Sequence, residues 1–312
     1  MEQTSAIYEP MIPMGWIGSE PVGRYIGWEL GRELPPDWCD VVVSRRLDCG
    51  IAVTTQRRGL TVYDFTEWTP GVPQFLRRPG RLFPTFGESS EAAKPALVQR
   101  LRVINTHLTL LHAATLVLDG QSPIVIRVNE RDLLRLEYPD DGGDAYWFLP
   151  LGGGLPTAVT VNDSRRHLIL SITACDRALE WLDAVVAADA LIVFDLLNQT
   201  QAAVSTHDYA LAVVAAWTIC ELRTRAAAAG LPGVSASSTA RSVCNALAHA
   251  ALVPSSVVTR LHTIRERRNA WLHSGAEPVE AEALEAMELA TVLLRDVVPD
   301  LTIRTTSDLL ML

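Results

Sequence analysis

Three side chains near the end of the chain, Arg268, Asn269 and His273, combine groups that can bind a phosphate and move a proton. Arg268 stands where a helical stripe of apolar residues predicts another apolar side chain. The other members of that stripe are Val257, Leu261, Ile264 and Trp271. Because burying a lone guanidinium is costly, we expect Arg268 to be paired, to lie in a cleft or to face a ligand.

Asn269 and His273 are four residues apart, so on a helix they lie on the same side. Gly275 predicts a left-handed cap, which puts His273 at the end of the helix. Imidazole titrates near neutral pH and suits a general base or acid. The planar fork of Arg268 suits two oxygens of a phosphate, and Asn269 could orient His273 or bond to the same phosphate.

The order Arg268-Asn269-x-x-x-His273 resembles the motif of the HEPN superfamily, in which Arg-(Asn/Asp/His) is followed by three to five residues and then His. These all-helical domains include many metal-independent ribonucleases of prokaryotic defence and toxin systems. The setting is similar as well: an apolar helix that ends at an acidic residue, a short helix, the motif helix closed by a glycine, and a last amphipathic helix. The resemblance covers residues 175–298 and says nothing about the first 170 residues.

RNA carries its own nucleophile, the 2′-hydroxyl, so its cleavage needs no metal or cofactor if the protein supplies a base, an acid and a cation at the phosphorus. His273 suits the first two roles and Arg268 the third. One chain offers only one such histidine, whereas in-line transfer uses both an acid and a base. The resemblance implies that two motifs meet across the twofold interface of a homodimer to form one site. Cleavage of RNA there would leave a 2′,3′-cyclic phosphate and a 5′-hydroxyl.

Further charged residues of the motif helix, His262, Arg265 and Arg267, could line a groove for the RNA backbone. The simpler interpretation of the two arginines is a solvated helix face. His273 also has a purely structural alternative, as a cation that faces the dipole at a helix C-terminus.

Glu221 and Arg225 have the spacing of an ordinary ion pair on one helix. The resemblance implies another role, because HEPN proteins often carry an acidic residue at this place that holds the motif arginine. Gly275 departs from one HEPN branch, paired with nucleotidyltransferases, which has a tyrosine there. The sequence therefore disfavours that branch.

Composition is typical of a soluble globular protein, with 48% apolar and 20% charged residues in 312 positions, enough for two domains. A net charge of −9 disfavours non-specific coating of nucleic acid. No signal peptide is visible, and the longest apolar candidate, residues 210–220, is too short to span a membrane. Five scattered cysteines argue against a disulfide scaffold and a structural zinc site, so we expect a cytoplasmic protein.

Residues 1–170 predict an α+β domain. Strands are expected at 41–43, 51–55, 60–63, 124–128, 133–138, 145–149 and 158–161, a helix at 96–118, and a loop or joint at 66–92. His107 and His112 lie five apart on that helix without a neighbouring ligand, so core or surface positions are favoured over a metal site. This half shows no catalytic constellation, and we expect it to sense, to bind a partner or to restrain activity.

Residues 171–312 predict an all-α, HEPN-like bundle of antiparallel helices. A long helix is expected from the cap Asp176 to Asn198. The next begins at Thr206 or Asp208 and ends near Ala229. A short helix capped by Ser237 or Ser238 reaches Ala251. Pro254 and Ser255 open the motif helix, the last helix has Pro278 near its start, and the structure of the tail from Pro299 is left undecided.

These patterns favour a metal-independent endoribonuclease, a toxin-like enzyme of anti-phage defence or abortive infection, gated by its N-terminal domain, a regulatory protein or a phage-derived trigger. That setting comes from the resemblance alone. The alternative is a non-catalytic HEPN module that dimerises or holds RNA as an adaptor in a larger complex. A third possibility is that the N-terminal half is the working part and the bundle only dimerises it.

Overall fold

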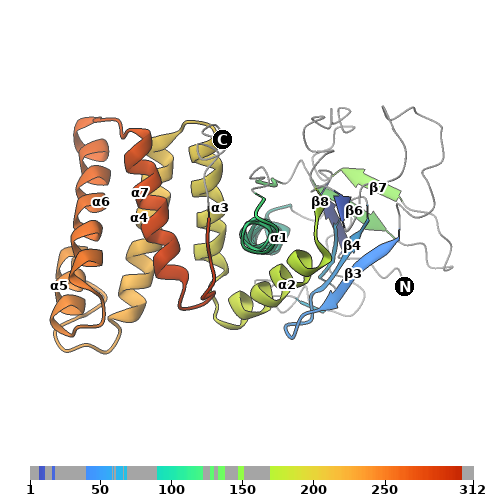
Figure 1. Cartoon of the computed structure of the whole chain (residues 1–312), viewed down its shortest axis with the longest axis horizontal. Coiled ribbons are helices and arrows are strands. Elements are labelled where there is room, and N and C mark those ends of the chain that lie inside the picture. Colours follow the sequence, from blue (N-terminus) through green and yellow to red (C-terminus); the bar gives the residue numbers. More distant parts are fainter. Residues whose placement is uncertain are drawn as a thin grey trace.

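The computed structural model describes residues 7–10, 16–17, 40–57, 59, 61–65, 67–68, 90–121, 127–129, 133–137, 147–150 and 169–303. Within these ranges the strands and helix α1 (Ser90–Asp119) form the first part, with the large sheet at one end of the molecule, and six further helices follow and extend to the other end (Figure 1). The predicted order, an α+β part followed by a helical part, is confirmed at this level.

The strands form one large and one small sheet. The large sheet contains β1 (Ile7–Pro10), β3 (Val41–Arg46), β4 (Ala52–Gln56), β5 (Thr61–Asp64), β6 (Leu133–Glu137) and β7 (Trp147–Pro150). Its order is β3-β4-β5-β1-β6-β7, and every neighbouring pair is antiparallel. The small sheet pairs β2 (Trp16–Ile17) with β8 (Ile169–Leu170) in parallel.

Alternation of side chains fixes the register of β4 and β5. Val53 and Thr55 are buried and lie opposite Tyr63 and Thr61, which are buried as well. The hydroxyls of Thr55 and Thr61 are 3.1 Å apart and bonded to each other. A slip of one residue would turn this face to solvent, so the pattern sets a single pairing.

Five of the predicted strands match β3, β4, β5, β6 and β7. Residues 127 and 128 of the predicted strand 124–128 are not in a strand. The side chain of Asn105 hydrogen-bonds to both backbone groups of Val128, so these groups do not pair with a strand. It accepts from the N–H at 2.8 Å and donates to the C=O at 3.1 Å. The predicted strand 158–161 and most of the joint 66–92 lie outside the described residues.

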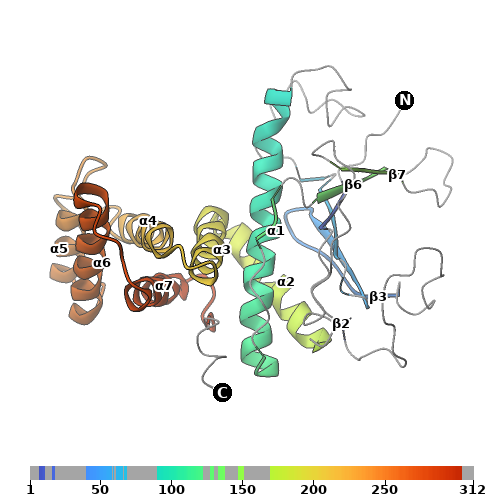
Figure 2. The same ribbon diagram turned by 90° about the horizontal axis from the view of Figure 1, so that it is seen from above.

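Helix α1 (Ser90–Asp119) lies between the large sheet and the helical bundle (Figures 1 and 2). It contains the predicted helix 96–118. Its stretch Val98–Asp119 is long and apolar enough to cross a membrane, but most of it is buried in the protein, as is usual for the core helix of a soluble protein.

The helix predicted from Asp176 to Asn198 is wrong as a single element. The structure has α2 (Ile172–Ala187) and α3 (Leu191–Ser205), with a corner between them at which Asp189 adopts a left-handed φ of 51°. The cap of α2 is Ser171, whose hydroxyl accepts from the N–H of Ala174 at 3.0 Å. The corner lets α2 pack beside α1 and β3 while α3 enters the bundle.

Four more helices complete the bundle: α4 (Tyr209–Ala227), α5 (Ala240–His249), α6 (Ser255–Ser274) and α7 (Glu280–Leu294). Asp208 caps α4 as predicted, by accepting from the N–H of Leu211 at 3.0 Å. The cap of α5 is Thr239 rather than Ser237 or Ser238, because its hydroxyl accepts from the N–H of Ser242.

One apolar core runs from the sheet through α1 into the bundle. A polar contact adds to the junction of α1 and α3. Asp195 of α3 accepts from Arg127 at 2.9 Å and lies 4.0 Å from Arg102 of α1. The domain boundary near residue 170 stays a prediction, and α1 is packed against both parts.

Candidate functional site

Helix α6 lies at the end of the molecule farthest from the large sheet, next to α5 (Figures 1 and 2). Arg260 ties its first half to α7 through Glu285 and Glu288, at 3.3 and 3.1 Å. The helix ends as predicted. Gly275 has a φ of 67° and its N–H donates to the C=O of Trp271 at 2.9 Å.

Gly275 gives a direct test of this helix end. An added Cβ would meet no atom within 4 Å, so the cost of Gly275→Ala comes from its positive φ alone. We expect a loss of about 1 kcal/mol in the free energy of unfolding, and a smaller loss for Gly275→Asn. Chemical denaturation of the three proteins measures it; an alanine variant as stable as the parent would contradict the left-handed cap.

The apolar stripe predicted along α6 is buried only in the first half of the helix. Leu261 and Ile264 are buried together with Val258, whereas Val257 is only partly buried. Arg268 and Trp271, farther along, are half-buried. Arg268 therefore lies where this face of α6 leaves the core, which explains how the stripe accommodates a charged residue.

Arg268 contacts Asn269 directly: its Nη1 donates to the Oδ1 of Asn269 at 3.0 Å. Its Nε is buried and has no hydrogen-bond partner among the described residues. Within the described part of the chain no carboxylate forms an ion pair with it. Of the three expectations for Arg268, pairing with an acid is therefore not met in the described residues.

His273 lies in the last turn of α6 with an exposed side chain. Among the described residues it makes no hydrogen bond and no ion pair. It follows Asn269 by four residues on a regular helix, so the two share one side of α6. The structure thus joins Arg268 to Asn269 by a contact and sets His273 beside them on the exposed end of the helix.

Glu221, expected from the resemblance to hold the motif arginine, instead binds Arg225 on its own helix. Its Oε1 accepts from the Nη2 and Nε of Arg225 at 2.8 and 3.1 Å. Arg225 also donates to the backbone C=O of Ser238 at 3.0 Å, which anchors the segment before α5. The structure therefore contains the ion pair between Glu221 and Arg225 on one helix, rather than a contact of Glu221 with Arg268.

The three residues expected to meet RNA have different surroundings. Arg267 is paired with Glu282 of α7 at 2.7 Å. Arg265 is mostly buried, its Nε has no partner, and its nearest acid is the exposed Glu266 at 3.5 Å. His262 has a buried Nδ1 without a partner.

Arg241 of α5 belongs to the same region, and sequence reasoning missed it. Burial lowers the pKa of His262, and the charges of Arg265 and Arg241 lower it further, against Glu266. Burial likewise raises the pKa of the Cys244 thiol on α5, and the charge of Arg265 opposes that rise. Positive charges from two helices therefore gather where α5 packs on α6.

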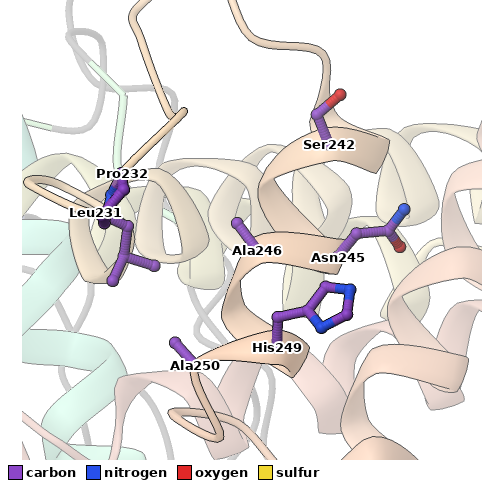
Figure 3. Close-up of a pocket in the computed structure, with 7 residues that line it drawn as sticks. All are labelled: Leu231, Pro232, Ser242, Asn245, Ala246, His249 and Ala250. Carbon is purple, nitrogen blue, oxygen red and sulfur yellow. The ribbon is translucent and has the colours of Figure 1, made fainter.

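A pocket lies between α5 and the loop that precedes it, and its lining includes none of the predicted site residues. Figure 3 shows its lining: Leu231 and Pro232 of the preceding loop, with Ser242, Asn245, Ala246, His249 and Ala250 of α5. None of these residues belongs to the motif. In the part of the chain that the structure describes, no group of three metal-binding side chains comes together either.

Comparison with known proteins found no matching family model, no similar curated protein and no similar solved structure.

Proposed function

We propose that the chain is a metal-independent endoribonuclease of the HEPN type, with Arg268, Asn269 and His273 at its site. The observation that carries this proposal is the state of Arg268. Its guanidinium contacts Asn269, lacks a carboxylate partner among the described residues, and lies within two turns of the exposed His273. A cation kept free beside an exposed imidazole suits a phosphodiester.

In the proposed reaction His273 takes the proton from the 2′-hydroxyl of the RNA, and the 2′-oxygen attacks the phosphorus. The bond from phosphorus to the 5′-oxygen breaks, and that oxygen receives a proton from an acid. Arg268 stabilises the charge that develops on the phosphoryl oxygens. With its Oδ1 bonded to Arg268, Asn269 keeps its amide donor for the phosphate or for His273.

The second imidazole comes from a second copy of the chain, which makes the enzyme a homodimer. The position of α6 supports this assembly, because the helix lies at the end of the molecule opposite the large sheet (Figure 1). Leu272 and Val279 are apolar and about half exposed, at 49% and 58%, on either side of the end of α6. Apolar side chains beside the motif suit a contact across a twofold axis.

A free ribonuclease harms the cell that makes it, so we propose that its activity is gated. The N-terminal part, a regulatory protein or a phage-derived trigger would supply the gate, in a setting of anti-phage defence or abortive infection. The resemblance of the motif to HEPN ribonucleases supports this setting.

Cleavage of labelled RNA in the presence of EDTA tests the reaction. We expect the purified protein to cut single-stranded RNA or tRNA and to leave 2′,3′-cyclic phosphate and 5′-hydroxyl ends, since the mechanism uses no metal. Product ends are read by sensitivity to phosphatase and by labelling with polynucleotide kinase. Cleavage that EDTA abolishes, or that leaves 5′-phosphate ends, would contradict the mechanism.

A second candidate is a non-catalytic adaptor that dimerises or holds RNA. Two observations favour it: one chain offers a single imidazole at the motif, and Glu221 binds Arg225 instead of Arg268. An adaptor would bind RNA without cutting it and would keep its assembly in a His273→Ala variant.

A further inference from the structure

The region where α5 packs on α6 carries more positive charge than the acids around it compensate. Arg265 has only 18% of its side chain exposed, and its Nε is buried without a partner. The nearest carboxylate, Glu266, lies 3.5 Å away and is 72% exposed, so water weakens its effect. Glu221, which also acts on Cys244 in this region, is already bound to Arg225.

Arg241 adds a cation from the first turn of α5, where its side chain is exposed. Within the described residues no hydrogen bond or ion pair engages it. His262 faces the same region and also has an unused ring nitrogen. Arg265 and His262 thus supply buried nitrogens that lack partners among the described residues, and Arg241 supplies an exposed charge.

These groups continue the motif along one side of α6. His262, Arg265 and Asn269 are spaced by three and four residues, and His273 follows four residues later. From His262 to His273 the helix rises by about 16 Å, at about 1.5 Å per residue. A strand whose scissile phosphate lies at His273 can therefore place neighbouring phosphates over this region.

We propose that Arg241, His262 and Arg265 form a second phosphate-binding subsite, which holds the backbone of the RNA strand beside the cleavage site. The inference rests on the proposed function, since it takes RNA to be the ligand at the motif. It assigns the backbone contact to α5 and α6 together. Arg267, whose charge is matched by Glu282, lies outside the subsite.

Binding of a fluorescent single-stranded RNA to the His273→Ala protein, followed by anisotropy over a series of salt concentrations, tests the subsite. We expect Arg241→Gln and Arg265→Gln, each added to this parent, to weaken binding by about three- to tenfold. Each should lower the slope of log affinity against log salt by about 0.7, the contribution of one contact to single-stranded RNA.

The matched control is Arg260→Gln, on the same helix and with the same change of charge. Arg260 is held by Glu285 and Glu288, so its loss should leave affinity and slope unchanged. Thermal unfolding confirms that each variant is folded; if the mostly buried Arg265 proves necessary for folding, the exposed Arg241 still decides the outcome.

Binding equal to that of the parent in Arg241→Gln, or an equal loss in Arg260→Gln, would overturn the subsite. Absence of RNA binding by the parent would overturn it as well. The measurement uses a chain that does not cleave, so it is independent of the proposed reaction. Arginine-dependent binding without cleavage by the wild type would keep the subsite and refute the nuclease.

Discussion

Replacing His273 with alanine is expected to lower RNA cleavage by at least about 10²- to 10⁴-fold, the usual contribution of a general base or acid. In a homodimer the loss is larger, because one substitution removes both imidazoles of the shared site. The free energy of unfolding should change by no more than about 0.5 kcal/mol, since the side chain is exposed and makes no hydrogen bond or ion pair among the described residues. Initial rates on labelled RNA, with denaturation and size-exclusion profiles, measure the two effects.

Arg268→Ala is expected to reduce cleavage by about 10²- to 10³-fold, through the loss of a cation at the developing phosphoryl charge. Arg268→Lys should recover only part of that loss, because an ammonium keeps the charge without the planar fork. Arg260→Ala serves as the control, being an arginine of the same helix that two glutamates hold away from the motif. Undiminished cleavage in both His273→Ala and Arg268→Ala would refute the assignment of the site.

Acid is expected to destabilise the chain through His107, a buried residue of α1 that contacts Tyr63 of the large sheet. Its Nδ1 lies 2.6 Å from the hydroxyl of Tyr63, and burial lowers its pKa to about 4. The unfolded chain takes up a proton at this histidine below a pKa of about 6.5, whereas the folded chain resists it. The free energy of unfolding linked to His107 is therefore largest above pH 6.5. It falls by about 3 kcal/mol as the pH drops from 6.5 to 4.

His107→Gln isolates this contribution. Glutamine keeps an acceptor for the hydroxyl of Tyr63 but does not titrate, so the loss of stability between pH 7 and pH 5 should shrink by about 2 kcal/mol relative to the wild type. The variant is less stable at neutral pH, and only the pH dependence decides the matter. Equal pH dependence in denaturant unfolding of the two proteins would show that His107 does not carry the effect.

The elements of the fold could be predicted wherever a local pattern determines them. The strands β3 to β5 follow from runs of β-branched residues, and the end of α6 follows from Gly275. The corner between α2 and α3 could not be predicted, because the residues around Asp189 include no glycine or proline. The apolar residues Leu179, Leu182, Val193 and Leu197 within the predicted helix are buried, although they belong to two helices.

At the site, spacing along one helix was enough to bring Arg268, Asn269 and His273 to one helix end. Contacts between helices were not predictable in the same way. Arg241 reaches the region from α5, and nothing in its local sequence points there. Glu221 pairs with Arg225 on its own helix instead of with Arg268. A contact expected from the resemblance to a family therefore did not predict the actual partner.

The position of α1 limits how the proposed nuclease can be activated. This helix belongs to the first half of the chain, yet it packs on α2 and α3 and shares their core. Proteolytic release of residues 171–312 would uncover that apolar surface and favour aggregation over activity. An activating signal should therefore leave the chain uncut and keep α1 docked, acting through a rearrangement around it.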